Sequence, residues 1–197
     1  MARMKIVRRP EDCSGSLQDA EQLFDIFFPE GSERQFNGAQ LGWGLVAAHH
    51  PQTAITMVKL TKLMAGGPFL TARPDLREIA IQTVNMHFQC EFSYRSHLAY
   101  LAKTGLSLET IAALPYWRTS NQFDAEKRLV IEYSLAVVAG DVSDELHDQV
   151  VSAFEQQGAT ELAFAVAHWS FWAMILNAAQ PQIDADEGAD VAAVRHQ

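Results

Sequence analysis

The sequence has few cysteines and no long hydrophobic runs. Of its 197 residues, only Cys13 and Cys90 carry a thiol. Two cysteines are too few for a disulfide framework, so we predict a reducing compartment and a cytoplasmic location. No stretch of about 18 uninterrupted apolar residues occurs, and no apolar run of signal-peptide length follows the basic start MARMKIVRRP. A membrane is therefore not an expected partner.

Positive charge is also scarce. Lys and Arg number 15 against 24 Asp and Glu, which gives a formal net charge of -9. Such a chain repels phosphate backbones, so nucleic acid is not an expected partner. Glycine-rich phosphate loops, GxSxG elbows and internal repeats are absent from the sequence. The 7 histidines lack the tight Cys/His clustering of a zinc site. We therefore expect no metal and no cofactor.

What the sequence does contain is a series of helices with few strand signals. Apolar residues repeat at helical spacing between caps such as Ser107 and Asp124 and stops such as Gly105 and Gly140. The expected helices are 16–28, 38–50, 51–65, 75–88, 90–104, 107–114, 124–140, 143–158 and 160–180. We predict an all-α fold, with an N-terminal helical arm (1–36), one helical domain (37–180) and an acidic tail (181–197).

A polar stripe follows one side of the predicted helix 75–88. Glu78, Gln82, Asn85 and Gln89 fall at helical spacing on a helix otherwise rich in core residues. Such a stripe is usually a solvated face. This one holds amides and one acid without any lysine, which leaves a pocket lining as the alternative.

The segment FQCEFSYRSH, residues 88–97, places a second polar group on one helical face. Cys90, Ser93, Tyr94 and His97 share a side over two turns if the helix begins near Cys90. The helix dipole favours a thiolate in the first turn, whereas Glu91 opposes it. The alternative is that Cys90 is a small buried hydrophobe and His97 a structural histidine. Both interpretations stay open at this level.

Three segments resemble the carboxymuconolactone decarboxylase family, which includes alkylhydroperoxidase D. They are LVAAHHPQTAITMVKLTKL, LREIAIQTVNMHFQCEFSYRSHLAYLAKTGLSLETIAAL and ELAFAVAHWSFWAMILNAAQ. The likeness runs from about residue 40 to 180 and is strongest from Arg77 to Leu114. The resemblance implies an all-helical, AhpD-like fold and homo-oligomers, commonly trimers or hexamers. It also implies an oligomer contact for the bulky last helix, which carries Trp169 and Trp172.

The same resemblance implies roles for individual residues. In the peroxidase branch, a glutamate, a CxxC pair and a histidine form a proton relay to a peroxide-reducing thiol. Glu78, Cys90 and His97 match three of these positions, but Ser93 stands where the peroxide-attacking cysteine belongs. Serine is a poor nucleophile towards peroxide, so the dithiol cycle should be absent. The decarboxylase branch commonly has a glutamate where Ser93 stands, so the chain departs from both branches.

Three functions remain open. The first is acid/base chemistry, as in a decarboxylase or lactone-type enzyme, on a small organic acid or lactone. His97 would then exchange the proton, Glu78 would orient it, and substrate would be bound by Gln82, Asn85, Ser93 and Tyr94. The second is a one-cysteine, peroxiredoxin-like antioxidant that reduces a hydroperoxide with Cys90, which needs an exposed thiol of low pKa. The third is a non-catalytic helical oligomer.

Restoring the missing sulfur tests the assignment of the CxxS motif. The wild-type protein should reduce alkyl hydroperoxide with a dithiol reductant far more slowly than a CxxC peroxidase does, whereas Ser93→Cys should gain part of that activity because the other residues already stand at the family spacing. A coupled peroxide-consumption assay measures both. Family-like turnover by the wild type would contradict the assignment.

Overall fold

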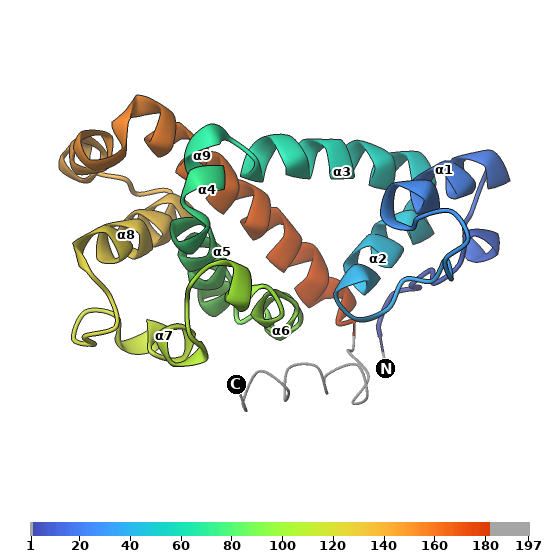
Figure 1. Ribbon diagram of the computed structural model, residues 1–197, viewed down its shortest axis with the longest axis horizontal. Coiled ribbons are helices and arrows are strands. Elements are labelled where there is room, and N and C mark those ends of the chain that lie inside the picture. The colour runs from blue at the N-terminus through green and yellow to red at the C-terminus, as the bar shows by residue number, and fades with distance from the viewer. Residues whose placement is uncertain (1, 182–197) are drawn as a thin grey trace. The chain divides into compact units, whose positions relative to one another are not determined.

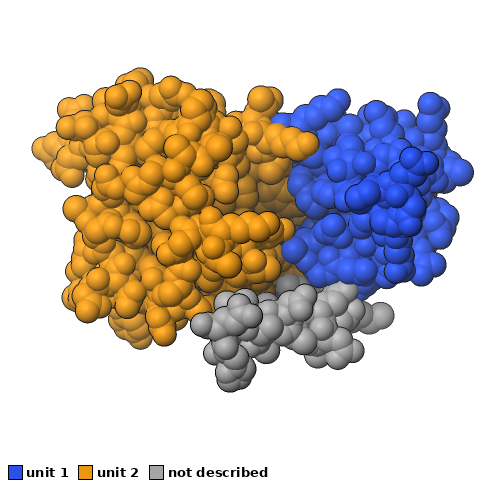
Figure 2. Space-filling model, viewed as in Figure 1, with its two compact units in different colours: residues 1–60, 176–197 blue, residues 61–175 orange. Residues whose placement is uncertain are grey.

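The computed structural model describes residues 2–181, and within this range every regular element is a helix, which confirms the predicted all-α class (Figure 1). The predicted acidic tail falls almost wholly outside the described residues. The chain divides into two compact units, residues 1–60 with 176–197 and residues 61–175 (Figure 2). The predicted boundary between an arm and a domain at residues 36 and 37 stays a prediction.

The first unit is built on aromatic packing. It holds η1 (Pro10–Asp12), α1 (Leu17–Phe27), η2 (Gly38–Gln40) and α2 (Leu41–His49). Phe24 of α1 is fully buried and its ring lies 4.3 Å from that of Phe36. Gly44 of α2 accepts the backbone N–H of Val7 at 3.0 Å, and a Cβ atom at Gly44 would lie only 2.2 Å from the Val7 carbonyl oxygen. Only glycine fits this approach.

The second unit contains the predicted site. Its elements are α4 (Pro68–Ala72), α5 (Pro74–Phe88), α6 (Glu91–Leu98), η3 (Leu101–Lys103), α7 (Leu108–Ala112), η4 (Leu114–Tyr116) and α8 (Ala125–Ala139). The helices α3 (Pro51–Ala65) and α9 (Asp144–Ala179) have residues in both units. The fully buried Leu76, Ile79 and Val84 of α5 supply core side chains, and α5 packs against α6 and α8.

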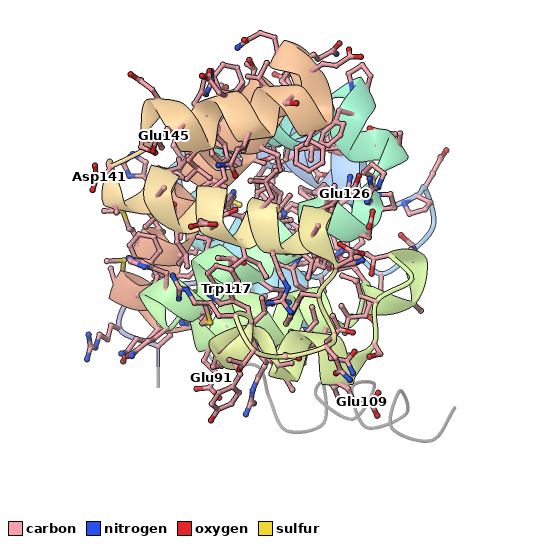
Figure 3. The ribbon with its side chains drawn as sticks, turned by 90° about the vertical axis from the view of Figure 1, so that its left-hand side faces the viewer. Glu91, Glu109, Trp117, Glu126, Asp141 and Glu145 are labelled. Carbon is pink, nitrogen blue, oxygen red and sulfur yellow. The ribbon has the colours of Figure 1, made fainter. Side chains whose placement is uncertain are left out.

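Sharp turns and caps hold the elements around α5. The α5 helix ends where Gln89 takes a left-handed conformation (φ 51°, ψ 41°), and α6 begins two residues later. The predicted caps Ser107 and Asp124 are present, because each side chain accepts the backbone N–H three residues on. Arg128 of α8 donates to the carbonyl groups of four residues in the preceding loop, namely Trp117, Arg118, Ser120 and Phe123. These bonds fix the segment that follows η4, whose Trp117 is labelled in Figure 3.

The last helix departs from the predicted pattern. Two helices were expected, ending and beginning around Gly158 and Thr160, but α9 runs from Asp144 to Ala179 with one non-helical residue, Glu155 (φ 59°, ψ 171°). The break therefore comes earlier than the glycine indicated, and Gly158 itself is helical.

By length and composition, α9 is also the one described helix that could cross a membrane, yet half of its most apolar window is buried inside the protein. Trp169 and Trp172 are buried at 9% and 7% exposure, whereas Phe164, Phe171 and Met174 are exposed. The indole rings predicted to fill an oligomer contact are thus already packed within the chain, and self-association stays a prediction.

Substitution of Gln89 tests the turn between α5 and α6. A β-branched side chain suffers most in the left-handed region, so Gln89→Val should lower the free energy of unfolding by about 1–2 kcal/mol, whereas Gln89→Gly should not lower it. Urea unfolding measures both values. Equal losses in the two variants would show that the Gln89 side chain, and not its backbone, matters at this position.

Candidate functional site

A carboxylate and an imidazole meet between α5 and α6. The Nδ1–H of His97 donates to Oε2 of Glu78 at 3.1 Å, across the chain reversal at Gln89. The Glu78 side chain is 4% exposed and that of His97 is 19% exposed. The structure therefore brings together the two residues that were expected to exchange protons, with the carboxylate inside and the imidazole within reach of solvent.

Trp169 of α9 determines which nitrogen of His97 carries the proton. Its indole N–H donates to Nε2 of His97 at 3.1 Å. An indole N–H can only donate, so Nε2 must offer a lone pair and the proton must lie on Nδ1. In this arrangement His97 is a neutral imidazole that donates to an ionised Glu78.

The rest of the predicted stripe continues from Glu78 as a chain of amides. Gln82 donates from Nε2 to Oε1 of Glu78 at 3.1 Å and to the backbone carbonyl of Tyr94 at 3.3 Å. Asn85 donates from Nδ2 to Oε1 of Gln82 at 3.1 Å. Glu78, Gln82 and Asn85 are each at most 3% exposed as whole residues, so the usual solvated-face interpretation is wrong for them. Gln89, at the end of the stripe, is exposed.

A cavity of about 350 Å³ lies beside this network. Its wall is formed by residues of the α5–α6 junction and by the α7–η4 segment: Asn85, Met86, Gln89, Cys90, Glu91, Tyr94, Ile111, Ala112, Leu114 and Pro115. Three of the predicted site residues, namely Asn85, Cys90 and Tyr94, therefore share one cavity. Glu78, Gln82, Ser93 and His97 do not belong to its wall.

Cys90 is buried at the N-terminal end of α6. It is 1% exposed, and burial raises the pKa of its thiol, although the backbone N–H of Ser93 works in the opposite direction. The helix N-terminus thus fails to produce the acidic, exposed thiol that the peroxidase interpretation needs, because desolvation is the larger effect. Ser93, three residues further along the chain, is 4% exposed and is therefore buried as well.

Two residues of α9 extend the site in a way that the sequence analysis missed. Trp169 contacts His97, and the neighbouring His168 accepts the indole N–H of Trp172 at 3.1 Å and lies 2.9 Å from the hydroxyl of Thr61. Burial lowers the pKa of His168. The contact between Trp169 and His97 depends on tertiary packing, because the two residues lie 72 positions apart in the chain. Only the His168–Trp172 spacing of one helical turn was visible in the sequence.

The expected absence of a metal ion stays a prediction. Among the described residues, no group of three or more His, Cys, Asp or Glu side chains is arranged to hold an ion. The absence of a cofactor stays a prediction.

Fold and site together define an all-helical protein with a buried carboxylate–histidine pair beside a small cavity. The debrominase Bmp8 has a similar fold. Its ligand-free crystal structure matches with a TM-score of 0.65 and 18% identity over 91% of this chain and 95% of Bmp8. A cysteine-to-alanine variant of Bmp8 in complex with 2,3,4-tribromopyrrole matches with a TM-score of 0.66 and 16% identity, over 98% of this chain and all of that one (100%).

Bmp8 has the carboxymuconolactone decarboxylase/AhpD-like fold, so the similarity supports the fold that the sequence resemblance implied. No family model and no curated protein matches the sequence. At this level of identity, the comparison concerns the fold and leaves the reaction open.

The buried His168 should make the protein sensitive to mild acid. Its pKa is lowered in the folded state, so its contribution to stability is complete above the ordinary histidine pKa of about 6.5 and is lost as the pH falls from there towards the folded value. Between about pH 7.5 and 5.5, the free energy of unfolding should fall more in the wild type than in His168→Gln. Urea unfolding at both pH values measures this difference, and equal losses would show that the pKa of His168 is the same in the folded and unfolded chains.

Proposed function

We propose that the protein is an enzyme that transfers protons on a small organic molecule bound in the cavity between the α5–α6 junction and the α7–η4 segment. The observation that carries the proposal is the buried Glu78 carboxylate bonded to Nδ1 of His97. A carboxylate in this position stabilises the imidazolium that forms when Nε2 accepts a proton. His97 is therefore the general base or acid, and Glu78 is its positioning residue.

The indole of Trp169 covers the reactive lone pair of His97 in the described state. Substrate would have to displace this N–H before Nε2 could take a proton. A ligand in the cavity would also have to extend past Tyr94, which is a wall residue three positions before His97 on α6. Side chains at this spacing are neighbours on a helix surface, so a ligand that extends beyond Tyr94 comes next to the imidazole.

The wall of the cavity bears on the type of substrate. Among its residues only Glu91 carries a formal charge, and none is a Lys or Arg. Of the substrates expected from the sequence, a neutral lactone therefore suits the cavity better than a free organic acid, whose carboxylate would find no cation there.

Thiol chemistry at Cys90 is the second candidate, because Cys90 belongs to the cavity wall whereas His97 does not. In that reaction the thiolate attacks a peroxide oxygen, an alcohol leaves, and an external thiol reduces the resulting sulfenic acid. The raised pKa of the buried thiol works against this route at neutral pH. A halogenated aromatic compound belongs among the test substrates, since a variant of Bmp8, which has a similar fold, forms a complex with 2,3,4-tribromopyrrole.

Three substitutions separate the candidates. In a screen of lactones, organic acids, hydroperoxides and bromopyrroles, Glu78→Gln and His97→Gln should each lower kcat at least about a hundredfold on the substrate that turns over, because both remove the proton exchange. Cys90→Ser should keep most of that activity. His87→Gln and Glu132→Gln are matched controls, since both residues are exposed on α5 and α8 and lie outside the pair.

The reverse pattern, with activity lost only in Cys90→Ser, would select the thiol reaction and reject the acid/base proposal. Melting temperatures of all five variants show whether a loss of activity reflects a loss of folding. Large destabilisation of Glu78→Gln and His97→Gln together with retained turnover would mean that the pair only holds α5 and α6 together.

A further inference from the structure

One buried hydrogen-bond acceptor, which belongs to a residue of the cavity wall, has no partner in the protein. Among the described residues that are not exposed, three buried side-chain polar atoms lack a hydrogen bond: Nε of Arg34, Oδ1 of Asn85 and Oγ of Ser134. Only Asn85 belongs to the cavity wall, and this residue is 1% exposed. Buried polar atoms are nearly always bonded, so an open acceptor at a cavity wall points to a ligand.

The orientation of the Asn85 amide is fixed by groups whose roles cannot change. The backbone carbonyl of Tyr94 can only accept, so Gln82 must direct Nε2 towards it and towards Glu78. Oε1 of Gln82 then faces Asn85, so Asn85 must donate a hydrogen from Nδ2 to it. A reversed Asn85 amide would set two acceptors against each other. The atom left open is therefore the oxygen, and what approaches it must bring a hydrogen.

The ionised end of the network makes this oxygen a better acceptor. Each amide donates towards the Glu78 carboxylate, so Gln82 and Asn85 are polarised in the same direction, with negative charge shifted towards Oδ1 of Asn85. Chains of hydrogen bonds in a low dielectric strengthen one another in this way. The same polarity disfavours an anion at this point.

The remaining wall is largely apolar. Met86, Ile111, Leu114 and Pro115 contribute hydrocarbon surface from two sides. The one charged wall residue, Glu91, is the first residue of α6 and is labelled in Figure 3. It is exposed and forms an ion pair with Arg95 at 2.9 Å. A cavity of about 350 Å³ is more than twice the size of a cavity of about 150 Å³ that holds benzene, so a substituted ring fits.

We propose that the cavity binds a neutral ring compound that carries an N–H or O–H donor, and that Oδ1 of Asn85 accepts this hydrogen. Phenols, pyrroles and hydroxylated or enolic lactones belong to this class, whereas carboxylates and rings without a donor do not. The inference rests on the proposed function in one respect, namely that this cavity is where substrate binds, and it narrows the substrate class.

Three fluorinated probes of similar size test the required donor. Trifluoromethyl-substituted phenol, anisole and benzoate differ in presenting a hydroxyl donor, no donor and an anion. Fluorine NMR titrations at about pH 6.5, where the phenol keeps its proton, give the dissociation constants. The phenol should bind about tenfold more tightly than the anisole, as one hydrogen bond to a buried acceptor predicts, and the benzoate should bind most weakly. Equal binding of phenol and anisole, preference for benzoate, or no binding by any probe at about millimolar concentration would overturn the proposal.

The two cysteines locate the bound probe. Cys90 is a wall residue and Cys13 is not, so saturating phenol should slow the alkylation of Cys90 by iodoacetamide and leave that of Cys13 unchanged. Peptide mass spectrometry reads both sites in the same sample. Unchanged alkylation of Cys90 would place the phenol elsewhere and contradict the assignment.

Variants assign the preference to the amide oxygen. Asn85→Leu keeps a similar volume without the acceptor, so the ratio of phenol to anisole affinity should fall from about ten to about one. Ser134→Ala is the matched control, because it also removes a buried oxygen that lacks a partner but lies outside the cavity wall. Its ratio should stay near the wild-type value. If Asn85→Leu does not fold, the wild-type ratio and the protection of Cys90 still decide the question.

Binding and turnover fail separately. His97→Gln should retain the preference for the phenol, since His97 does not form the cavity wall. If the preference for phenol over anisole is retained but turnover does not depend on Glu78 and His97, the acid/base function is rejected and the ligand class is kept. Turnover that depends on the pair, together with equal affinity for phenol and anisole, keeps the function and rejects the ligand class.

Discussion

The candidate site depends on one buried negative charge, the carboxylate of Glu78. A charge inside a protein is costly unless donors surround it, and here one oxygen receives the His97 N–H and the other receives the Gln82 amide. Two groups with invariant roles, the indole N–H of Trp169 and the carbonyl of Tyr94, fix the direction of every bond between them. The tautomer of His97 and the open acceptor of Asn85 are both consequences of this arrangement.

The chain reversal at Gln89 makes that arrangement possible. Glu78 lies in the second turn of α5, and His97 lies in the last turn of α6. A continuous helix would hold residues 19 positions apart about five turns from each other, far beyond hydrogen-bond distance. The left-handed backbone at Gln89 turns α6 back along α5, so that a carboxylate and an imidazole from one stretch of sequence meet at 3.1 Å.

The same junction separates two kinds of chemistry. On one side the Glu78–His97 pair is connected to α9 through Trp169, and on the other side Cys90 faces the cavity with Asn85 and Tyr94. Burial opposes the thiolate at Cys90, whereas the carboxylate–imidazole pair is satisfied in the state that accepts a proton. The amides of Gln82 and Asn85 connect the two halves. This contrast between the Glu78–His97 pair and the buried Cys90 thiol favours the proposed acid/base chemistry over thiol chemistry.

The sequence by itself determined the all-α class, the caps at Ser107 and Asp124, the helix break at Gln89 and the spacing that lets Glu78 reach His97, because caps, stops and periodicity are local properties. It placed the break in α9 near Gly158 although the non-helical residue is Glu155, since packing overrides local propensity. It left open whether the polar stripe faced water. Only the tertiary structure buried Gln82 and Asn85, brought Trp169 to His97 and formed the cavity from α7 and η4, because these contacts join residues distant in the chain and depend on which faces the helices present to one another.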